Sequence, residues 1–217
     1  MKVSVLIPTF NEVNNIGKVL DEIPKDSVSE VLIIDGHSND GTVEMVKKLG
    51  YPVIFQKNKG FGSAVSEGMQ AIGGEVAVLI NGDYSQNPKD IPLLLKKIEE
   101  GYDFVMASRY LPGSGSADDT VLHYLGNRLF THLCNFIHGS HYSDTLYFFF
   151  AVKKRVFEKI KVESPGFEYC MELPIKIHKA GFKIAQIPSF ERKRTTGQAK
   201  VKAFSDGWKI LKAIFKH

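Results

Sequence analysis

Residues 75–88, EVAVLINGDYSQNP, run from an apolar stretch of strand type straight into a short polar turn. The carboxylate of Asp83 comes just after the last apolar residue of that stretch, Ile80. Ligands of an open parallel sheet bind beyond the carboxyl ends of the strands, so this segment predicts a carboxylate at a ligand-binding edge. Carboxylate oxygens suit Mg²⁺ or Mn²⁺. The alternative interpretation is an ordinary turn closed by an Asx hydrogen bond.

The segments around this stretch alternate between strand and helix patterns with short connections. The expected strands are residues 3–7, 31–34, 53–55, 76–80, 104–107 and 183–187, and the expected helices are 14–23, 42–49, 62–72, 91–100, 121–137, 168–180 and 203–215. Residues 111–120 and 193–200 are predicted loops, and the aromatic run 147–150 receives no element. The series predicts an α/β fold with a Rossmann-like, mostly parallel sheet flanked by helices.

The bulk composition is that of a soluble globular protein. The chain has 217 residues, 43% of them hydrophobic and 24% charged, so one domain is the default. No apolar run approaches the roughly 20 residues that cross a bilayer, and the first residues are too polar for a signal peptide. A cytoplasmic protein is therefore expected. Cys134 and Cys170, far apart in apolar surroundings, are expected to be buried, reduced thiols.

Positive charge is concentrated at the end of the chain. Residues 191–217 hold eight Lys or Arg and two acids, a balance of +6, which leaves −2 for the first 190 residues of the +4 total. In the last predicted helix one face carries Phe204, Trp208, Leu211 and Phe215, and a neighbouring face carries Lys209, Lys212 and Lys216. This amphipathic helix either lies in the interface of anionic lipids or packs its apolar face on the domain. No nucleic-acid partner is expected.

Three predicted strand ends deliver polar residues, in segments 8–12, 35–42 and 81–83. Each has a structural explanation by itself, as a turn or a helix cap. In a doubly wound sheet, however, these strand ends share one edge, so their acids are expected to converge on one crevice. The sequence therefore predicts a phosphate-binding edge.

Five segments together resemble the successive motifs of the family 2 glycosyltransferases. They are VSVLIPTFNEVNNI (3–16), VLIIDGHSNDGT (31–42), NKGFGSAVSEGM (58–69), NGDYSQNP (81–88) and ASRYLPG (107–113). Within the family the chain is most similar to the polyprenyl-phosphate glycosyltransferase branch, which includes dolichol-phosphate mannose synthase. The resemblance covers most of the chain and is strongest in the first hundred or so residues.

The resemblance implies a GT-A fold, a nucleotide-diphospho-sugar donor such as a UDP-, GDP- or dTDP-sugar, and Mg²⁺ or Mn²⁺. It divides a single domain, 1–217, into a donor half (1–110), an acceptor half (111–190) and a basic loop with the last helix (191–217). It also implies roles for individual residues. By this likeness Pro8, Thr9, Asn11 and Glu12 line the nucleoside pocket, Asp35 accepts from the base, and Asp83 with Asn81, on either side of Gly82, holds the metal on the donor diphosphate. Three further residues are candidates for the donor site: Gly62, which tolerates close backbone approach, and Lys59 and Arg109, which either assist on the phosphates or are solvated surface charges. Arg194 lies in a basic loop that can fold over the donor or acceptor phosphates as a lid.

Two departures from the family pattern are visible. The usual first Asp of the metal motif is Asn81, which supplies no charge. The stretch that often reads D-x-T-S-G-F-R begins here at Asp144, and its Gly and Arg positions are filled by Phe148 and Phe150. The acceptor half therefore matches the branch less closely than the donor half.

The nature of the acceptor decides whether a general base is needed. Transfer to a hydroxyl needs one, and Glu172 is the candidate with Glu168 as the alternative, whereas an ionised phosphate needs none. The basic tail favours a polyprenyl phosphate at the inner face of a membrane. The alternatives are a soluble or glycan hydroxyl, a sugar-nucleotidyltransferase, and a non-catalytic nucleotide-sugar-binding module.

Overall fold

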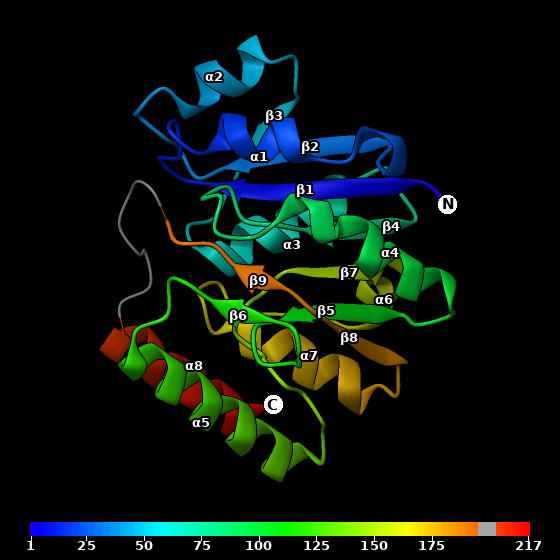
Figure 1. Cartoon of the computed structure of the whole chain (residues 1–217), viewed down its shortest axis with the longest axis vertical. Helices are drawn as coiled ribbons and strands as arrows, with labels where there is room; N and C mark the ends of the chain where they lie inside the picture. Colours follow the sequence, from blue (N-terminus) through cyan, green and yellow to red (C-terminus); the bar gives the residue numbers. More distant parts are fainter. Residues whose placement is uncertain (195–202) are drawn as a thin grey trace.

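The computed structural model describes residues 1–194 and 203–217, and its centre is a seven-stranded sheet between two layers of helices (Figure 1). The strand order is β3-β2-β1-β4-β7-β5-β8. Every neighbouring pair is parallel except those of β7, which is antiparallel to β4 and β5. The strands are β1 Val3–Thr9, β2 Glu30–Asp35, β3 Val53–Phe55, β4 Val76–Leu79, β5 Phe104–Ser108, β7 Phe150–Lys153 and β8 Ile184–Pro188. A separate parallel pair joins β6 Gly115–Ser116 to β9 Phe190–Glu191.

The helices divide between the two faces of the sheet. One hydrophobic cluster takes residues from α1 Ile16–Glu22, α2 Thr42–Lys48 and α4 Ile91–Glu99. The other takes residues from α3 Phe61–Ala71, α5 Val121–His138, α6 Lys154–Lys159, α7 Tyr169–Lys179 and α8 Ala203–Lys216. Two short 3₁₀ turns, η1 Lys25–Ser27 and η2 Pro88–Asp90, complete the elements. The predicted mostly parallel α/β sheet is confirmed.

Burial on both faces explains the apolar strand sequences. In β1, Val5 and Ile7 belong to one cluster, whereas Leu6 between them belongs to the other. Successive side chains of a strand point to opposite faces, so a central strand with two covered faces has no polar alternation. That is why the runs in β1, β2 and β4 read as continuous apolar segments.

The prediction missed the strand β7, which begins at Phe150, the last residue of the aromatic run, and lies between β4 and β5. The run itself has period two, because Phe148 and Phe150 lie in one cluster while Tyr147 and Phe149 lie in the other. The predicted loop 111–120 also contains a strand, β6, and α6 was not predicted. Most of the predicted loop 193–200 lies outside the described residues.

Two expectations from composition are testable here. Both cysteines are buried free thiols, as predicted. Burial raises the pKa of Cys134 to about 11, so that thiol is unreactive at neutral pH. Within residues 1–194 and 203–217, no helix has the length and hydropathy that a membrane span requires.

Candidate active site

The loops that follow β1, β2 and β4 meet at one edge of the sheet. The Thr9 hydroxyl donates to the Asp35 carboxylate at 2.8 Å, and the Glu12 backbone N–H donates to the Thr42 hydroxyl at 2.8 Å. A Cβ built on Gly82 would lie 2.9 Å from the Cγ2 atom of Thr9, so the third loop packs against the first. The three loops therefore meet at one edge, and glycine at 82 allows their close approach. That their acids line one crevice stays a prediction.

Asp35 holds the first two loops together. Its carboxylate is fully buried and accepts hydrogen bonds from the Thr9 hydroxyl (2.8 Å), the Ser38 hydroxyl (2.7 Å) and the Ser38 backbone N–H (2.7 Å). Asn11 adds a second link, since its N–H donates to the Ser38 hydroxyl at 2.8 Å. Pro8 is half-buried at the end of β1. The contact of Asp35 with a nucleoside base stays a prediction.

Backbone strain is concentrated in these three loops. Among the described non-glycine residues, positive φ angles occur at Asn11 (55°), His37 (65°), Tyr84 (65°) and Phe148 (53°), and the first three each follow one of the converging strands. Asparagine tolerates this conformation, but a bulky residue such as Tyr84 adopts it only where surrounding contacts impose it. Strain of this kind persists chiefly at binding and catalytic sites.

Tyr84 is held by contacts from both ends of the chain. Its hydroxyl donates to Glu22 of α1, and the guanidinium carbon of Arg192 lies 4.6 Å from the centre of its ring. Arg192 also donates to Glu22 at 2.8 Å and to the Asn87 side chain at 2.5 Å. Arg192, in the segment after β9, therefore contacts and holds the turn that carries Asp83. The sequence prediction missed this set, because no local pattern joins residues so far apart.

Asp83 has one carboxylate oxygen in a turn and one facing a cation. Oδ1 accepts from the Ser85 N–H (3.1 Å) and hydroxyl (2.7 Å), which is the Asx turn of the alternative interpretation. Oδ2 lies 3.5 Å from Nε of Arg194, which in turn lies 3.1 Å from Oδ2 of Asp118. The Asn81 backbone N–H donates to the Gln86 side chain at 2.8 Å. Asp83 therefore closes an Asx turn with one carboxylate oxygen and faces a positive charge with the other.

The side-chain oxygens at this edge suit a metal ion whose other coordination positions are filled by a bound ligand. In the described part of the chain, no three His, Cys, Asp or Glu side chains are grouped as a metal site. Asp83 supplies one carboxylate, with the amide of Asn81 two positions before it. Mg²⁺ is commonly bound by one or two carboxylates together with substrate phosphates and water. The residues fit Mg²⁺ or Mn²⁺ in that form and not as an all-protein cage.

Lys59 and Gly62 lie at the start of α3. Lys59 is exposed in the turn before the helix. A Cβ on Gly62 would lie 2.2 Å from the carbonyl oxygen of Ser164, and one on Gly60 would lie 2.1 Å from that of Pro165. These glycines let α3 pack closely on residues 164–166, so the contacts of Gly62 are structural.

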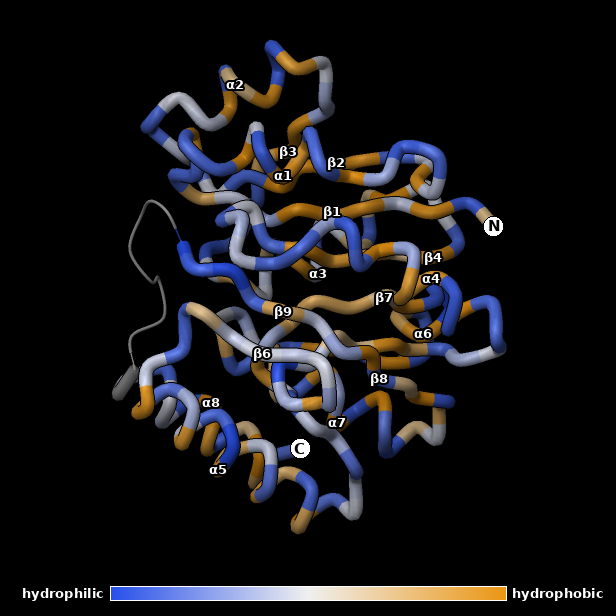
Figure 2. The backbone as a smooth tube through the Cα atoms, in the orientation of Figure 1, coloured by the Kyte–Doolittle hydropathy of each residue, from blue (hydrophilic) through white to orange (hydrophobic). Residues whose placement is uncertain are grey.

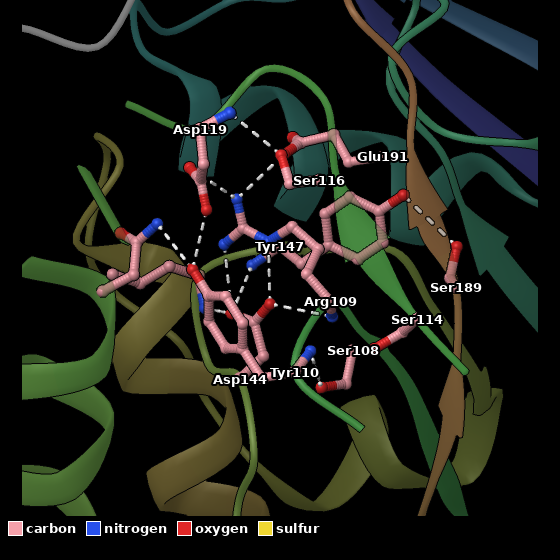
Figure 3. A network of polar contacts seen from close by, with 12 residues as sticks. Ser108, Arg109, Tyr110, Ser114, Ser116, Asp119, Asp144, Tyr147, Ser189 and Glu191 are labelled. Carbon is pink, nitrogen blue, oxygen red and sulfur yellow. Dashed lines mark hydrogen bonds and ion pairs between the residues drawn. The ribbon is translucent and has the colours of Figure 1, made fainter. Parts of the chain in front are cut away.

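Arg109 is the centre of a buried cluster of charges (Figure 3). Its Nε and Nη2 donate to the two oxygens of Asp144 at 2.8 and 3.2 Å, and Nη1 donates to Glu191 at 3.2 Å and Asp119 at 3.5 Å. Burial acts to lower the pKa of Arg109, but the charge of Asp144 outweighs it, and that pKa is raised well above its usual value.

This arrangement changes the interpretation of Arg109. All three guanidinium nitrogens donate to carboxylates of the chain itself, so the geometry does not support the predicted contact with phosphates. Asp119 and Glu191 were absent from the sequence hypothesis. Burial raises the pKa of Glu191, and the positive charge of Arg109 opposes this shift. The cluster joins β5, β9 and the start of α5.

The two phenylalanines that depart from the family pattern occupy different structural positions. Phe148, at the glycine position, keeps the left-handed backbone that glycine favours, with φ 53°. Phe150, at the arginine position, is fully buried in β7, with its ring 5.2 Å from that of Phe104. The chain therefore places core packing where the pattern has a cation.

Glu172, the candidate base, is fully buried in α7. Its oxygens accept from the backbone N–H groups of Glu163 (2.9 Å) and Ser164 (2.8 Å), and Lys176 lies 2.6 Å away. Burial acts to raise the pKa of Glu172, but the hydrogen bonds from Lys176 and the 163–164 backbone lower it to about 2. A carboxylate so well paired is a poor proton acceptor, and the geometry favours a structural role.

Glu172→Gln is expected to lower the free energy of unfolding by roughly 2–3 kcal/mol at neutral pH, because hydrogen bonds to a charged group are lost. The pKa of Glu172 is lower in the folded protein than in the unfolded chain, so its charged form stabilises the fold at pH values above the unfolded pKa of about 4.3. This stabilisation is lost as the pH falls toward about 2. Urea unfolding between pH 7 and 3 should therefore show a flatter pH dependence in the variant. Glu158→Gln, an exposed site on α6, is the control. Unchanged stability with lost activity would restore Glu172 as the base.

Comparison with known proteins agrees with this geometry. The family model "Glycosyl transferase family 2" matches residues 4–161. The chain is 32% identical over 216 residues to a dolichyl-phosphate hexose transferase of Haloferax volcanii, covering 98% of this chain and 92% of the relative. It is 31% identical over 196 residues to glycosyltransferase AglJ of the same organism, and 30% over 212 residues to a dolichol-phosphate mannosyltransferase of Pyrococcus furiosus. These matches cover 90% and 93% of this chain but only 64% and 60% of those two relatives.

Solved structures share the fold at low sequence identity. Glucosyl-3-phosphoglycerate synthase of Mycobacterium tuberculosis, in complex with Mn²⁺, UDP and phosphoglyceric acid, superposes with a TM-score of 0.81 at 20% identity, covering 99% of this chain and 77% of the other. The same enzyme with Mg²⁺ and UDP gives 0.81 at 19%, covering 99% and 78%. The fold is therefore GT-A, as predicted. With the family model matching most of its length, the chain belongs to glycosyl transferase family 2.

Proposed function

We propose that the protein transfers a sugar from a nucleotide-diphospho-sugar to a polyprenyl phosphate, with inversion at the anomeric carbon. The observation that carries the proposal is Asp83, at the edge where three loops converge, with Oδ2 facing a cation 3.5 Å away. The Mycobacterium tuberculosis structures, with UDP and Mn²⁺ or Mg²⁺, support a nucleotide-sugar donor. The Haloferax and Pyrococcus names support a lipid phosphate acceptor.

In the proposed reaction a phosphate oxygen of the acceptor attacks the anomeric carbon of the donor sugar. The bond from that carbon to the donor diphosphate breaks, and the nucleoside diphosphate leaves with the electron pair. Mg²⁺ or Mn²⁺, held by Asp83 and Asn81, would supply Lewis-acid stabilisation of this leaving group. Arg194 brings a guanidinium to the same edge, where it can donate to developing negative charge. Thr9, Glu12 and Asp35 fix the loops on which a nucleoside would lie.

The state of Glu172 argues against this residue as the base for transfer to a hydroxyl, which leaves only the alternative Glu168 for that reaction and supports phosphate as the acceptor. Transfer to a hydroxyl needs a base, and this carboxylate is buried, paired and held at a pKa of about 2. A phosphate is already ionised at neutral pH. We also propose that the protein is cytoplasmic and peripheral to the inner face of a membrane, with no nucleic-acid partner; the lipid-phosphate acceptors in the relatives' names support the membrane location.

A donor panel tests the proposal. UDP-, GDP- and dTDP-sugars are incubated with Mg²⁺ or Mn²⁺, with and without polyprenyl phosphate, and the products are weighed by mass spectrometry. One donor is expected to add a single sugar to the lipid. Transfer only to a soluble or glycan hydroxyl would contradict the acceptor. Neither transfer nor hydrolysis of any donor would favour a non-catalytic binding module.

Arg194→Gln is expected to tighten Mn²⁺ binding in the absence of donor by up to about fivefold, since a half-exposed ion pair of this kind is worth roughly 1 kcal/mol at most. The guanidinium competes with the metal for Oδ2 of Asp83. Titration calorimetry with Mn²⁺ alone measures the effect. Arg155→Gln, which removes one of the two cations that pair with Asp103, is the control. Weaker Mn²⁺ binding in Arg194→Gln would show that no competition exists.

A further inference from the structure

The outer face of α5 carries an apolar stripe that no part of the described chain covers. It consists of Val121, Leu122, Leu125, Leu129 and Phe136, with exposures from 58% at Leu125 to 88% at Phe136. The opposite side of the helix already supplies the core, through Cys134 and the packed side chains of Phe130 and Leu133. A water-facing helix normally has a polar outer face, and clustered exposed apolar residues mark an interaction surface.

The neighbouring helix α8 presents a second apolar face to solvent. Ile210, Ala213 and Ile214 are buried against the domain, whereas Trp208 and Phe215 are 58% and 67% exposed. The sequence left open whether Trp208 and Phe215 pack on the domain or meet lipid, and the buried face proves to be a different one. Figure 1 shows α5 and α8 side by side, and hydrophobic positions recur along both in Figure 2.

Direct contacts join the two helices into one surface. The ring of His138, at the end of α5, lies 2.9 Å from the carbonyl oxygen of Ile214. A Cβ on Gly207 of α8 would lie 3.8 Å from the ring of Phe130. We call the exposed residues of α5 together with Trp208 and Phe215 the α5–α8 surface.

The charges around the α5–α8 surface favour an anionic lipid bilayer as its partner. α5 contains no Asp or Glu, and the only acid of α8, Asp206, is buried and lies 3.7 Å from Lys209. Lys209, Lys212 and Lys216 are exposed beside Trp208 and Phe215. A second copy of the chain would bring like charges together, whereas an anionic bilayer offers both opposite charge and an apolar interior.

The surface is also tied to the active site. Thr120 caps α5, its hydroxyl accepting from the His123 N–H at 3.2 Å, immediately after Asp118 and Asp119. Asp118 pairs with Arg194, and Asp119 belongs to the Arg109 cluster. A bilayer seated on α5 would therefore lie next to the edge that holds Asp83.

We propose that the α5–α8 surface docks the protein on an anionic lipid bilayer, with α5 as the main inserting element. Its link to the active site rests on the proposed function, because a lipid phosphate must reach that site from the bilayer. Docking itself needs neither donor nor acceptor, so it can be tested separately.

Vesicle flotation with phosphatidylglycerol–phosphatidylcholine mixtures and with phosphatidylcholine alone measures docking. The wild type is expected to float with the anionic vesicles, less so at high salt. Leu125→Ser with Leu129→Ser should weaken this partition by roughly tenfold or more, since each leucine loses buried apolar area. The control is Leu49→Ser with Leu93→Ser, two leucines that are 46% and 48% exposed, directly after α2 and in α4, and it should float as the wild type does.

Two results would overturn the docking proposal. One is equal flotation of the α5 variant and the wild type. The other is a dimer in light scattering that the α5 variant converts to a monomer while the wild type ignores vesicles, which would assign the surface to a second copy. Sugar transfer to a short, water-soluble polyprenyl phosphate separates the two hypotheses: its retention in the α5 variant leaves the chemistry intact, and its absence from a wild type that floats contradicts the function but not the docking.

Discussion

Asp83→Asn is expected to lower sugar transfer by a factor of about 10³ while the protein keeps its fold, because Asp83 would hold the metal ion that stabilises the leaving diphosphate, and losing one preorganised stabiliser of a developing anion costs about that much. Asparagine retains the oxygen that Ser85 binds, so the turn at 82–85 should survive. The lost charge should also weaken Mn²⁺ binding. The initial rate of product formation at saturating donor measures the loss of transfer, the thermal midpoint checks the fold, and titration calorimetry measures the binding of Mn²⁺.

The control for this variant is Asp118→Asn, which removes the other carboxylate beside Arg194. Asp118 is not a predicted metal ligand, so its loss should lower the rate far less. Near-wild-type transfer by Asp83→Asn would remove Asp83 from the site. An equal loss in both variants would assign the effect to the placement of Arg194.

Arg109→Met is expected to lower the free energy of unfolding by about 3–5 kcal/mol, because it leaves buried carboxylates without their cation. Asp144 is fully buried and loses both of its guanidinium hydrogen bonds. Urea unfolding at neutral pH measures the loss. At acid pH the difference should narrow, because protonation neutralises the orphaned acids.

A double-mutant cycle separates the ion pair from simple packing. Arg109→Met combined with Asp144→Leu should be less destabilised than the sum of the two single variants, because contacting charges are coupled. Strict additivity, or a loss below about 1 kcal/mol for Arg109→Met alone, would mean that the cluster does not stabilise the fold.

Strands of the sheet were predictable where the sequence of the strand itself shows an apolar run. β1, β2 and β4 are apolar because both faces are covered, and their polar ends indicated the ligand edge. β7 was missed because only its first residue, Phe150, belongs to the aromatic run, and its other three residues are too few to show a periodic pattern. β6 and β9 have two residues each, which is too short for any periodic pattern.

Polar residues that follow a single strand were predictable from local motifs, whereas contacts between distant segments were not. Asp83 comes four positions after Leu79, the last residue of β4, so the sequence alone placed it at this edge of the sheet, and its role as a metal ligand stays a prediction. Arg109 looked like an available cation because its partners Asp144 and Glu191 lie 35 and 82 residues further along. The clamp of Arg192 on Tyr84 and Glu22 depends on contacts across nearly the whole chain. Such pairings follow from the completed fold.

The most direct test of the account compares two acceptors that differ only in the phosphate. The protein is incubated with its preferred nucleotide sugar, Mg²⁺ or Mn²⁺, and either a polyprenyl phosphate or the matching polyprenyl alcohol, and the lipid products are weighed. The account predicts a sugar added to the phosphate and none to the alcohol, in wild type and in Glu172→Gln alike. Transfer to the alcohol that Glu172→Gln abolishes would contradict it.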